Sequence, residues 1–192
     1  IKIKQLYDEA LGVIWQSEFD KNMITKLWGD PKMGRSVIRN GIEQVQSAPS
    51  NELLEIRNRY EHVFVCASNW HPQKRLRANI ELFSHLQNNG YQNSCLIVLG
   101  SNPDCWVPSP HVMYAGPQSH QNCLAVYSIA DWMLHLAWLD HCPNVIVEAL
   151  SQNLPVICSS TGGTRELVKD FGVVIEEQPY NYELVDYDHP PK

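Results

Sequence analysis

The sequence predicts an α/β fold built on a doubly wound parallel sheet. Two observations lead to this prediction: short, nearly continuous apolar segments recur along the chain, and helical patterns of about ten to fifteen residues separate them. Strands covered by helices on both faces have this composition, because neither face contacts water. The expected strands span residues 12–15, 35–41, 62–68, 94–100, 111–116, 131–138, 154–160 and 171–175.

Three helices are expected between these strands. The segment 75–90 places apolar side chains near one face and ends in Gly90, a residue typical of a helix C-cap. The segment 119–130 has Ser119 available as its N-cap. The third helix is expected to begin at Pro143. An N–H group at the first helical position has no partner within the helix, so proline, which lacks this group, is tolerated there.

The chain divides at the polar, turn-rich segment 42–51. We expect residues 1–41 to be the tail and linker of another domain, and residues 42–192 to form the main domain. The last residues, from 176 onward, are acidic and proline-rich, which indicates either a disordered tail or a domain that is incomplete at its C-terminus.

Composition excludes several classes of protein. The net charge of −6 comes with dispersed Lys and Arg, which argues against binding of nucleic acid or an anionic membrane. The apolar segments are far shorter than the roughly 20 residues of a transmembrane helix, so we expect a soluble chain. The six cysteines are widely spaced and favour reduced thiols and a cytoplasmic location, and no Cys or His spacing predicts a metal site.

One carboxylate, Glu148, stands in an otherwise apolar helical segment, "NVIVEAL". A helix that is apolar all round is normally buried, and a buried carboxylate needs hydrogen-bond donors, a ligand or its own proton. Glu148 is therefore a candidate binding residue.

Four loops are expected at the carboxyl edge of the sheet, where doubly wound folds bind ligands. The loop "NWHPQKR" carries Asn69, Lys74 and Arg75 just before a helix, a plausible phosphate site. On its own, this loop is better explained by solvated residues of a first turn. Asp140 and the residues after it precede the helix of Glu148.

The other two loops follow the strands 111–116 and 154–160. Gly116, Pro117 and Gln118 could meet a flat base through main-chain groups, although taken alone a simple turn is the better explanation. The double glycine of "SSTGGTREL" allows close approach of backbone, but it lacks the G-x-G-x-x-G pattern of dinucleotide-binding proteins. A nicotinamide oxidoreductase is therefore disfavoured.

The segment "LDHCPNVIVEALSQNLPVICSSTGGTREL" resembles the donor-site motif of glycosyltransferase family 4, E-G-F-P-N-V-x-x-E-A-x-A-x-G-x-P-V-V-A-x-x-x-G-G-x-x-E. Upstream, "ASNWHPQKR" resembles the G-R-x-x-x-x-K turn of the family, and "RSVIRNGIE" resembles its V-I-x-N-G-V-D segment. The positions in register are Asp140, Pro143, Asn144, Glu148, Ala149, Pro155, Val156, Gly162, Gly163 and Glu166.

This resemblance implies the C-terminal, Rossmann-like half of a GT-B fold, truncated, with residues 1–41 as the end of an acceptor domain. It implies transfer of a sugar from a UDP-, GDP- or ADP-linked donor to an acceptor hydroxyl, with retention and without metal. It also implies an acceptor glycan or lipid-linked sugar bound by the missing domain, in polysaccharide assembly, with peripheral contact to a membrane as an option.

The resemblance also implies roles for individual residues. Glu148 would accept both ribose hydroxyls, Lys74 would stabilise the leaving diphosphate, and Asp140 would stabilise positive charge on the sugar ring. Backbone groups of His141, Cys142, Pro143 and Asn144 would hold the sugar hydroxyls.

Three positions depart from the family pattern: Asn69 replaces an arginine, Asp140 a glutamate and His141 a glycine. Arg75 or Arg77 would have to replace the missing cation, and His141 would crowd or redirect the sugar pocket. Two functions therefore remain open: an active glycosyltransferase donor domain, which is favoured, and an inactive nucleotide-sugar binding or scaffold module.

Overall fold

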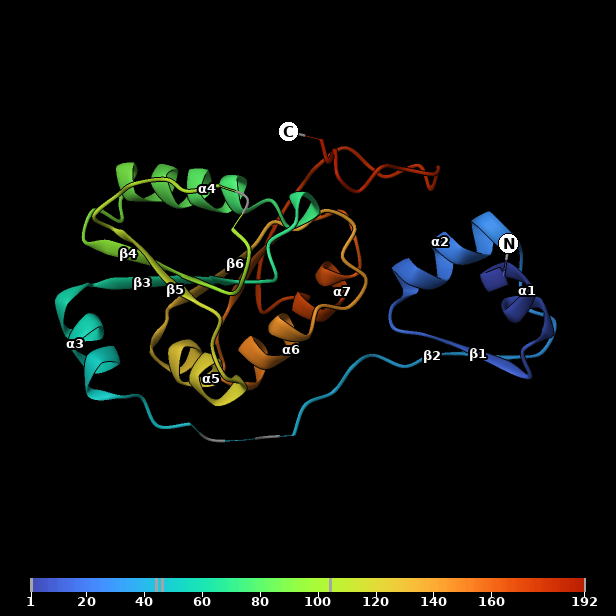
Figure 1. Cartoon of the computed structure of the whole chain (residues 1–192), viewed down its shortest axis with the longest axis horizontal. Helices are drawn as coiled ribbons and strands as arrows, with labels where there is room; N and C mark the ends of the chain where they lie inside the picture. Colours follow the sequence, from blue (N-terminus) through green and yellow to red (C-terminus); the bar gives the residue numbers. More distant parts are fainter. Residues whose placement is uncertain (1, 44, 46, 104, 192) are drawn as a thin grey trace.

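Six parallel strands form the main sheet of the protein, in the order β5-β4-β3-β6-β7-β8 (Figure 1). The computed structural model describes residues 2–43, 45, 47–103 and 105–191. This architecture confirms the predicted α/β, Rossmann-like fold. The strands are β3 (His62–Ala67), β4 (Ser94–Leu99), β5 (Val112–Gly116), β6 (Trp132–His135), β7 (Val156–Ser159) and β8 (Gly172–Ile175).

Helices cover both faces of this sheet, as the apolar character of its strands predicts. Side chains of β3 alternate, with Val63 and Val65 in the core on one face and Phe64 and Cys66 in the core on the other. Helix α4 (Leu76–Asn88) covers the second face. Four helices cover the first: α3 (Asn51–Arg59), α5 (His120–Ile129), α6 (Asn144–Ser151) and α7 (Thr164–Val168) (Figure 1).

The helix ends agree closely with the sequence signals. The Ser119 hydroxyl accepts a hydrogen bond from Asn122 N and caps α5 as predicted, and Pro143 directly precedes the first residue of α6. Helix α4 stops slightly earlier than expected, because Asn89 is its C-cap and Gly90 follows with a φ of +133°.

The N-terminal segment forms a small unit of its own. Strands β1 (Gly12–Trp15) and β2 (Gly34–Val37) pair in parallel as a separate two-stranded sheet, joined by α2 (Glu18–Trp28) and preceded by α1 (Lys2–Glu9). Strand β1 has the predicted bounds, and β2 is shorter than predicted. Helices α1, α2, α3 and α7 were not predicted.

The C-terminal residues 176–191 contain neither helix nor strand, but they pack across the N-terminal unit. Tyr180, Tyr182 and Tyr187 lie against an apolar cluster that includes Phe19 and Met23 of α2. The tail therefore links the carboxyl edge of the main sheet to α2 (Figure 1).

Candidate functional site

The loops that follow β3 and β6 meet at the carboxyl edge of the sheet. After β3, a short 3-10 helix, η1 (Pro72–Lys74), ends at Arg75, which has a left-handed backbone conformation with φ +50°. The Trp138 N–H donates to the Gln73 carbonyl, and the Leu136 N–H donates to the side chain of Asn79 in α4. These bonds hold the two loops together and bring Lys74 to Asp140.

Lys74 and Asp140 form a largely buried ion pair. Lys74 Nζ donates to Asp140 Oδ2 at 2.5 Å, and the two side chains are 20% and 12% exposed. His135, at the end of β6, is buried and places its Nε2 3.3 Å from the same oxygen, although the two atoms are not aligned as a hydrogen bond. Burial alone would raise the pKa of Asp140, but His135 and Lys74 hold that pKa well below its usual range. Asp140 is therefore a fixed negative charge.

The double glycine positions the backbone of Asp140. Gly162 pairs with Asp140 in a parallel β-bridge, and the Gly163 N–H donates to the Asp140 carbonyl at 2.6 Å. A Cβ atom at Gly162, where φ is +116°, would lie 2.7 Å from that carbonyl oxygen, and one at Gly163 would lie 1.9 Å from the His141 carbonyl oxygen. Both positions need glycine because the two loops approach so closely.

Glu148 faces a polar cavity of about 540 Å³ between α6 and the N-terminal unit. Its side chain is 20% exposed, and along α6 only Ile146 and Ala149 are buried. The expectation of a helix buried all round is therefore wrong, because α6 packs one side against β6 and β7 and turns another side to this cavity.

Within the described residues, no side chain donates a hydrogen bond to the Glu148 carboxylate. Its nearest cationic partner is His120, whose Nε2 lies 3.9 Å from Oε1. Burial raises the pKa of Glu148, and the charge of His120 lowers it in part. The carboxylate thus keeps acceptor capacity for a ligand.

The segment from His141 to Asn144 contacts the N-terminal unit. His141 Nδ1 lies 3.0 Å from Asp20 Oδ1, and its ring packs edge-on against Phe19. Asn40 Nδ2 donates to the Cys142 carbonyl at 3.2 Å and to Asn144 Oδ1 at 2.8 Å. Asp20 therefore holds the His141 ring against α2, and the expectation that His141 crowds or redirects the sugar pocket stays a prediction. Cys142 and Pro143 are buried, and Asn144 lines the cavity of Glu148.

Two predicted phosphate ligands, Asn69 and Arg75, have protein partners in this structure, and their binding roles stay predictions. The Asn69 side-chain oxygen accepts from Ser101 Oγ at 2.7 Å and from Asn102 Nδ2 at 3.1 Å. Arg75 is 9% exposed and donates to Glu177 Oε1 at 2.5 Å, because its left-handed turn directs it toward the C-terminal tail. The arrangement leaves Lys74 as the cation of this loop that lies beside Asp140.

Comparisons with known proteins place this geometry in a family. The sequence profile described as "Glycosyl transferases group 1" matches residues 55–185, which is more than half of the chain. The chain belongs to the glycosyl transferases group 1 family. No curated protein matches its sequence.

Solved structures share the fold of this group 1 glycosyltransferase chain. Anabaena Alr3699/HepE, solved in complex with UDP-glucose, is 18% identical with a TM-score of 0.73, over 91% of this chain and 52% of that one. Sucrose-phosphate synthase from Thermosynechococcus elongatus is 19% identical with a TM-score of 0.68, over 92% and 48%. A UDP-forming α,α-trehalose-phosphate synthase from Burkholderia xenovorans is 10% identical with a TM-score of 0.72, over 91% and 52%. The chain therefore spans about half the length of these structures.

The three residues predicted to meet a base, Gly116, Pro117 and Gln118, are divided between two cavities of the group 1 chain, with Pro117 beside Gly116. Gly116 borders a cavity of about 310 Å³ at the ends of β4 and β5, where Trp106 stacks on Tyr114 with ring centroids 3.9 Å apart. Gln118 donates to the Ala115 carbonyl and lines a separate cavity of about 610 Å³ between α3 and α5. The loop thus divides these residues between the two faces of the sheet.

Sequence reasoning missed four residues that shape the group 1 site: His135, Asp20, Asn40 and Gln16, whose amide donates to Asn40 at 3.2 Å. His135 stands in an apolar strand and gave no signal of its own. Asn40 lies in the segment that resembles V-I-x-N-G-V-D, but no role was predicted for it.

The described part of the chain contains neither a candidate metal site nor a membrane-spanning helix. Among those residues, no group of His, Cys, Asp and Glu side chains could hold a metal ion, so independence from metal stays a prediction. No helix found there has the length and apolar character needed to cross a membrane.

Proposed function

We propose that the chain is the donor-binding part of a retaining family 4 glycosyltransferase. Residues 42–192 bind a nucleotide-sugar, and residues 1–41 are the end of the acceptor domain and the linker. The sugar passes to an acceptor hydroxyl of a glycan or lipid-linked sugar, in polysaccharide biosynthesis. Membership of the group 1 family supports this proposal, as does the fold shared with a protein solved in complex with UDP-glucose.

The observation that carries the proposal is the cavity of Glu148. Its carboxylate, at the carboxyl edge of a parallel sheet, faces a polar space of about 540 Å³ and has no protein hydrogen-bond donor among the described residues. Two carboxylate oxygens match the two adjacent hydroxyls of a ribose, each of which donates one hydrogen bond. Such a ligand offsets the cost of partly burying the charge.

Lys74 and Asp140 carry the charges of the reaction in this proposal. As the bond from the anomeric carbon to the phosphate oxygen breaks, negative charge grows on the diphosphate and positive charge grows on the sugar ring. Lys74 stabilises the first and Asp140 the second, since the low pKa of Asp140 keeps it ionised. The acceptor oxygen then bonds to the anomeric carbon, and its proton passes to the departing diphosphate. Positive charge from a lysine suits a mechanism that needs no metal.

The nucleobase has a plausible position beside Gly116. The cavity there has Trp106 and Tyr114 as an aromatic wall and adjoins Ser101, which is hydrogen-bonded to Asn69. Aromatic rings and backbone groups together recognise flat bases. The buried thiols of the chain suit the reducing cytoplasm, where we place the reaction.

Calorimetric titration with UDP, GDP, ADP and their glucose and mannose conjugates tests the proposal. One nucleotide should bind, and Glu148→Ala should weaken it by about 10- to 100-fold through loss of hydrogen bonds to a charged group. Glu81→Ala, an exposed carboxylate on α4, is the matched control and should bind normally. Equal binding by both variants, or no nucleotide binding by the folded chain, would contradict the proposal.

A second candidate function is nucleotide-sugar binding without turnover. It is favoured by the small number of cations at the diphosphate position, since Asn69 replaces an arginine and Arg75 is held by Glu177. This alternative would be established if the chain binds a nucleotide-sugar through Glu148 but shows no hydrolysis, even slow, and no sugar transfer when it is joined to an acceptor domain.

A further inference from the structure

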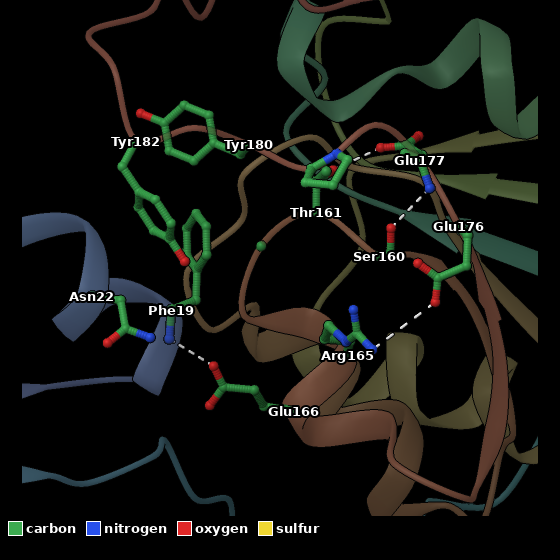
Figure 2. Close-up of a pocket in the computed structure, with 12 residues that line it drawn as sticks. Phe19, Asn22, Ser160, Thr161, Arg165, Glu166, Glu176, Glu177, Tyr180 and Tyr182 are labelled. Carbon is green, nitrogen blue, oxygen red and sulfur yellow. Dashed lines mark hydrogen bonds and ion pairs between the residues drawn. The ribbon is translucent and has the colours of Figure 1, made fainter.

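A second cavity, distinct from that of Glu148, lies between α2 and the ends of β7 and β8 (Figure 2). Its volume is about 260 Å³, room for about nine waters at about 30 Å³ each, which suits one sugar ring with its hydroxyls. Gly162 lines it and also pairs with Asp140, so one strand of backbone separates this cavity from the proposed donor site.

Aromatic rings form one wall of this cavity. Phe19 lies 6.2 Å from Tyr180 and 6.1 Å from Tyr182, and the two tyrosine rings are 5.2 Å apart, measured between centroids. Figure 2 shows the three rings gathered on one side with Asn22 next to them, and Arg165, Glu176 and Glu177 on the other side. The flat apolar faces of such rings pack against the C–H groups of a sugar.

Two carboxylates that line the cavity, Glu166 and Glu177, are already bonded to groups of the protein. Glu166 accepts from the backbone N–H groups of Glu18 at 2.9 Å and Phe19 at 2.7 Å, which fixes the start of α2. Glu177 accepts from Arg75 and from Thr161 Oγ1 at 2.7 Å, which fixes the tail. The walls on both sides are therefore held before any ligand enters.

Among the described residues of this cavity, the polar side chains available to a ligand include Asn22, Arg165 and Glu176. Arg165 and Glu176 approach only to 4.0 Å and are both largely exposed, so their charges balance without a firm bond. Together with the amide of Asn22, they offer donors and acceptors in the mixture that pairs of hydroxyls require. Glu166 and Glu177 are paired with Arg39 and Arg75, so the cavity is close to neutral, which suits an uncharged ligand.

We propose that this cavity binds one uncharged saccharide unit. Its assignment as a unit of the acceptor rests on the proposed function, because it places that unit beside the loop of Asp140. The rings of Phe19, Tyr180 and Tyr182 stack on the sugar, and Asn22, Arg165 and Glu176 bond its hydroxyls. Residues from the tail and from α2 together complete the site.

Saturation-transfer NMR on the full chain tests the proposal, with the methyl α-glycosides of glucose, galactose, mannose and N-acetylglucosamine as probes. At least one probe should bind at millimolar concentration. Tyr182→Ala and Asn22→Ala should each weaken it by about tenfold, the size expected for an aromatic contact or a hydrogen bond. Leu184→Ala is the matched control, since this side chain of the tail is 89% exposed and lies outside the cavity.

The variant Glu148→Ala separates this proposal from the proposed function. Saccharide binding that survives Glu148→Ala and is lost in Tyr182→Ala supports the second cavity, whatever the nucleotide titrations give. Saccharide binding that is lost in Glu148→Ala and survives Tyr182→Ala overturns it, because the sugar then occupies the donor site. Absence of binding by every probe to the folded chain, with UDP binding intact, overturns it as well.

Discussion

Replacing Lys74 by methionine should have two separable effects, because Lys74 both pairs with Asp140 and is proposed to bind a diphosphate. Removing one partner of a fully buried ion pair costs about 3 to 5 kcal/mol, and an exposed pair is worth about 0 to 1 kcal/mol. The two side chains are 20% and 12% exposed, and His135 remains 3.3 Å from Asp140. We therefore expect a loss of about 2 kcal/mol in the free energy of unfolding, or about 4 to 8 °C in Tm.

The second effect is on nucleotide affinity. Loss of a charge-assisted contact of about 1.5 to 3 kcal/mol weakens UDP by about 10- to 150-fold. Uridine has no phosphate, so Lys74→Met should leave its affinity unchanged. Calorimetric titration with both ligands measures the difference, with Lys32→Met, an exposed lysine, as the control.

A double-mutant cycle with Asp140→Asn completes this test. If the ion pair is the cause, Asp140→Asn should cost less in the Lys74→Met background than alone, with a coupling of about 1 to 2 kcal/mol. Strictly additive losses of stability would refute the energetic role of the pair. Equal weakening of UDP and uridine would refute the diphosphate role of Lys74.

Three further predictions follow from the site and the core. Burial raises the pKa of Glu148 above the ordinary glutamate value of 4.5. On acidification, UDP affinity should therefore fall at a higher pH than it would with an ordinary glutamate. Glu148→Gln should remove this pH dependence in titrations repeated across pH. Gly163→Ala places a Cβ 1.9 Å from the His141 carbonyl oxygen and should cost about 1 to 3 kcal/mol in urea unfolding, whereas Gly41→Ala meets no atom within 4 Å and should cost less. Burial raises the pKa of the Cys95 thiol to about 12, so it should react with a thiol reagent only after unfolding, and rapid labelling of the native chain would contradict this.

The main sheet could be predicted because its strands are buried on both faces. Six of the predicted apolar segments contain the six strands of that sheet. Successive side chains of β3 point to opposite faces, so that Val63 and Phe64 lie in different parts of the core. Helix α3 gave no comparable signal: it has no buried residue, and its sequence "NELLEIRNR" follows a polar linker. A surface helix of this kind depends on its cap, here Ser50, more than on an apolar face.

The site could be predicted only as far as the loops that build it. Lys74 and Asp140 were both expected at the carboxyl edge, and the structure pairs them. The partners of Asn69 and His141 could not be predicted, since Ser101 and Asp20 lie far along the chain and no local pattern ties them together. Arg75 turns away because its backbone is left-handed, a conformation that its sequence does not favour.

The pairing of Lys74 with Asp140 bears on how one lysine could serve a diphosphate. Their pair is close to neutral as a unit, so a diphosphate that enters beside Lys74 also meets the negative charge of Asp140. In the proposed reaction, that repulsion is smallest when the sugar ring lies between the diphosphate and Asp140, because the ring becomes positive as its bond to phosphate breaks. In the ground state the ring is neutral and the repulsion remains, so the arrangement stabilises the separated charges more than the intact donor. Stabilisation confined to the transition state is what accelerates a reaction, whereas a site built for binding alone would gain from Asp140 only the stability of its pair with Lys74. The position of Asp140 therefore favours turnover over the binding-only alternative.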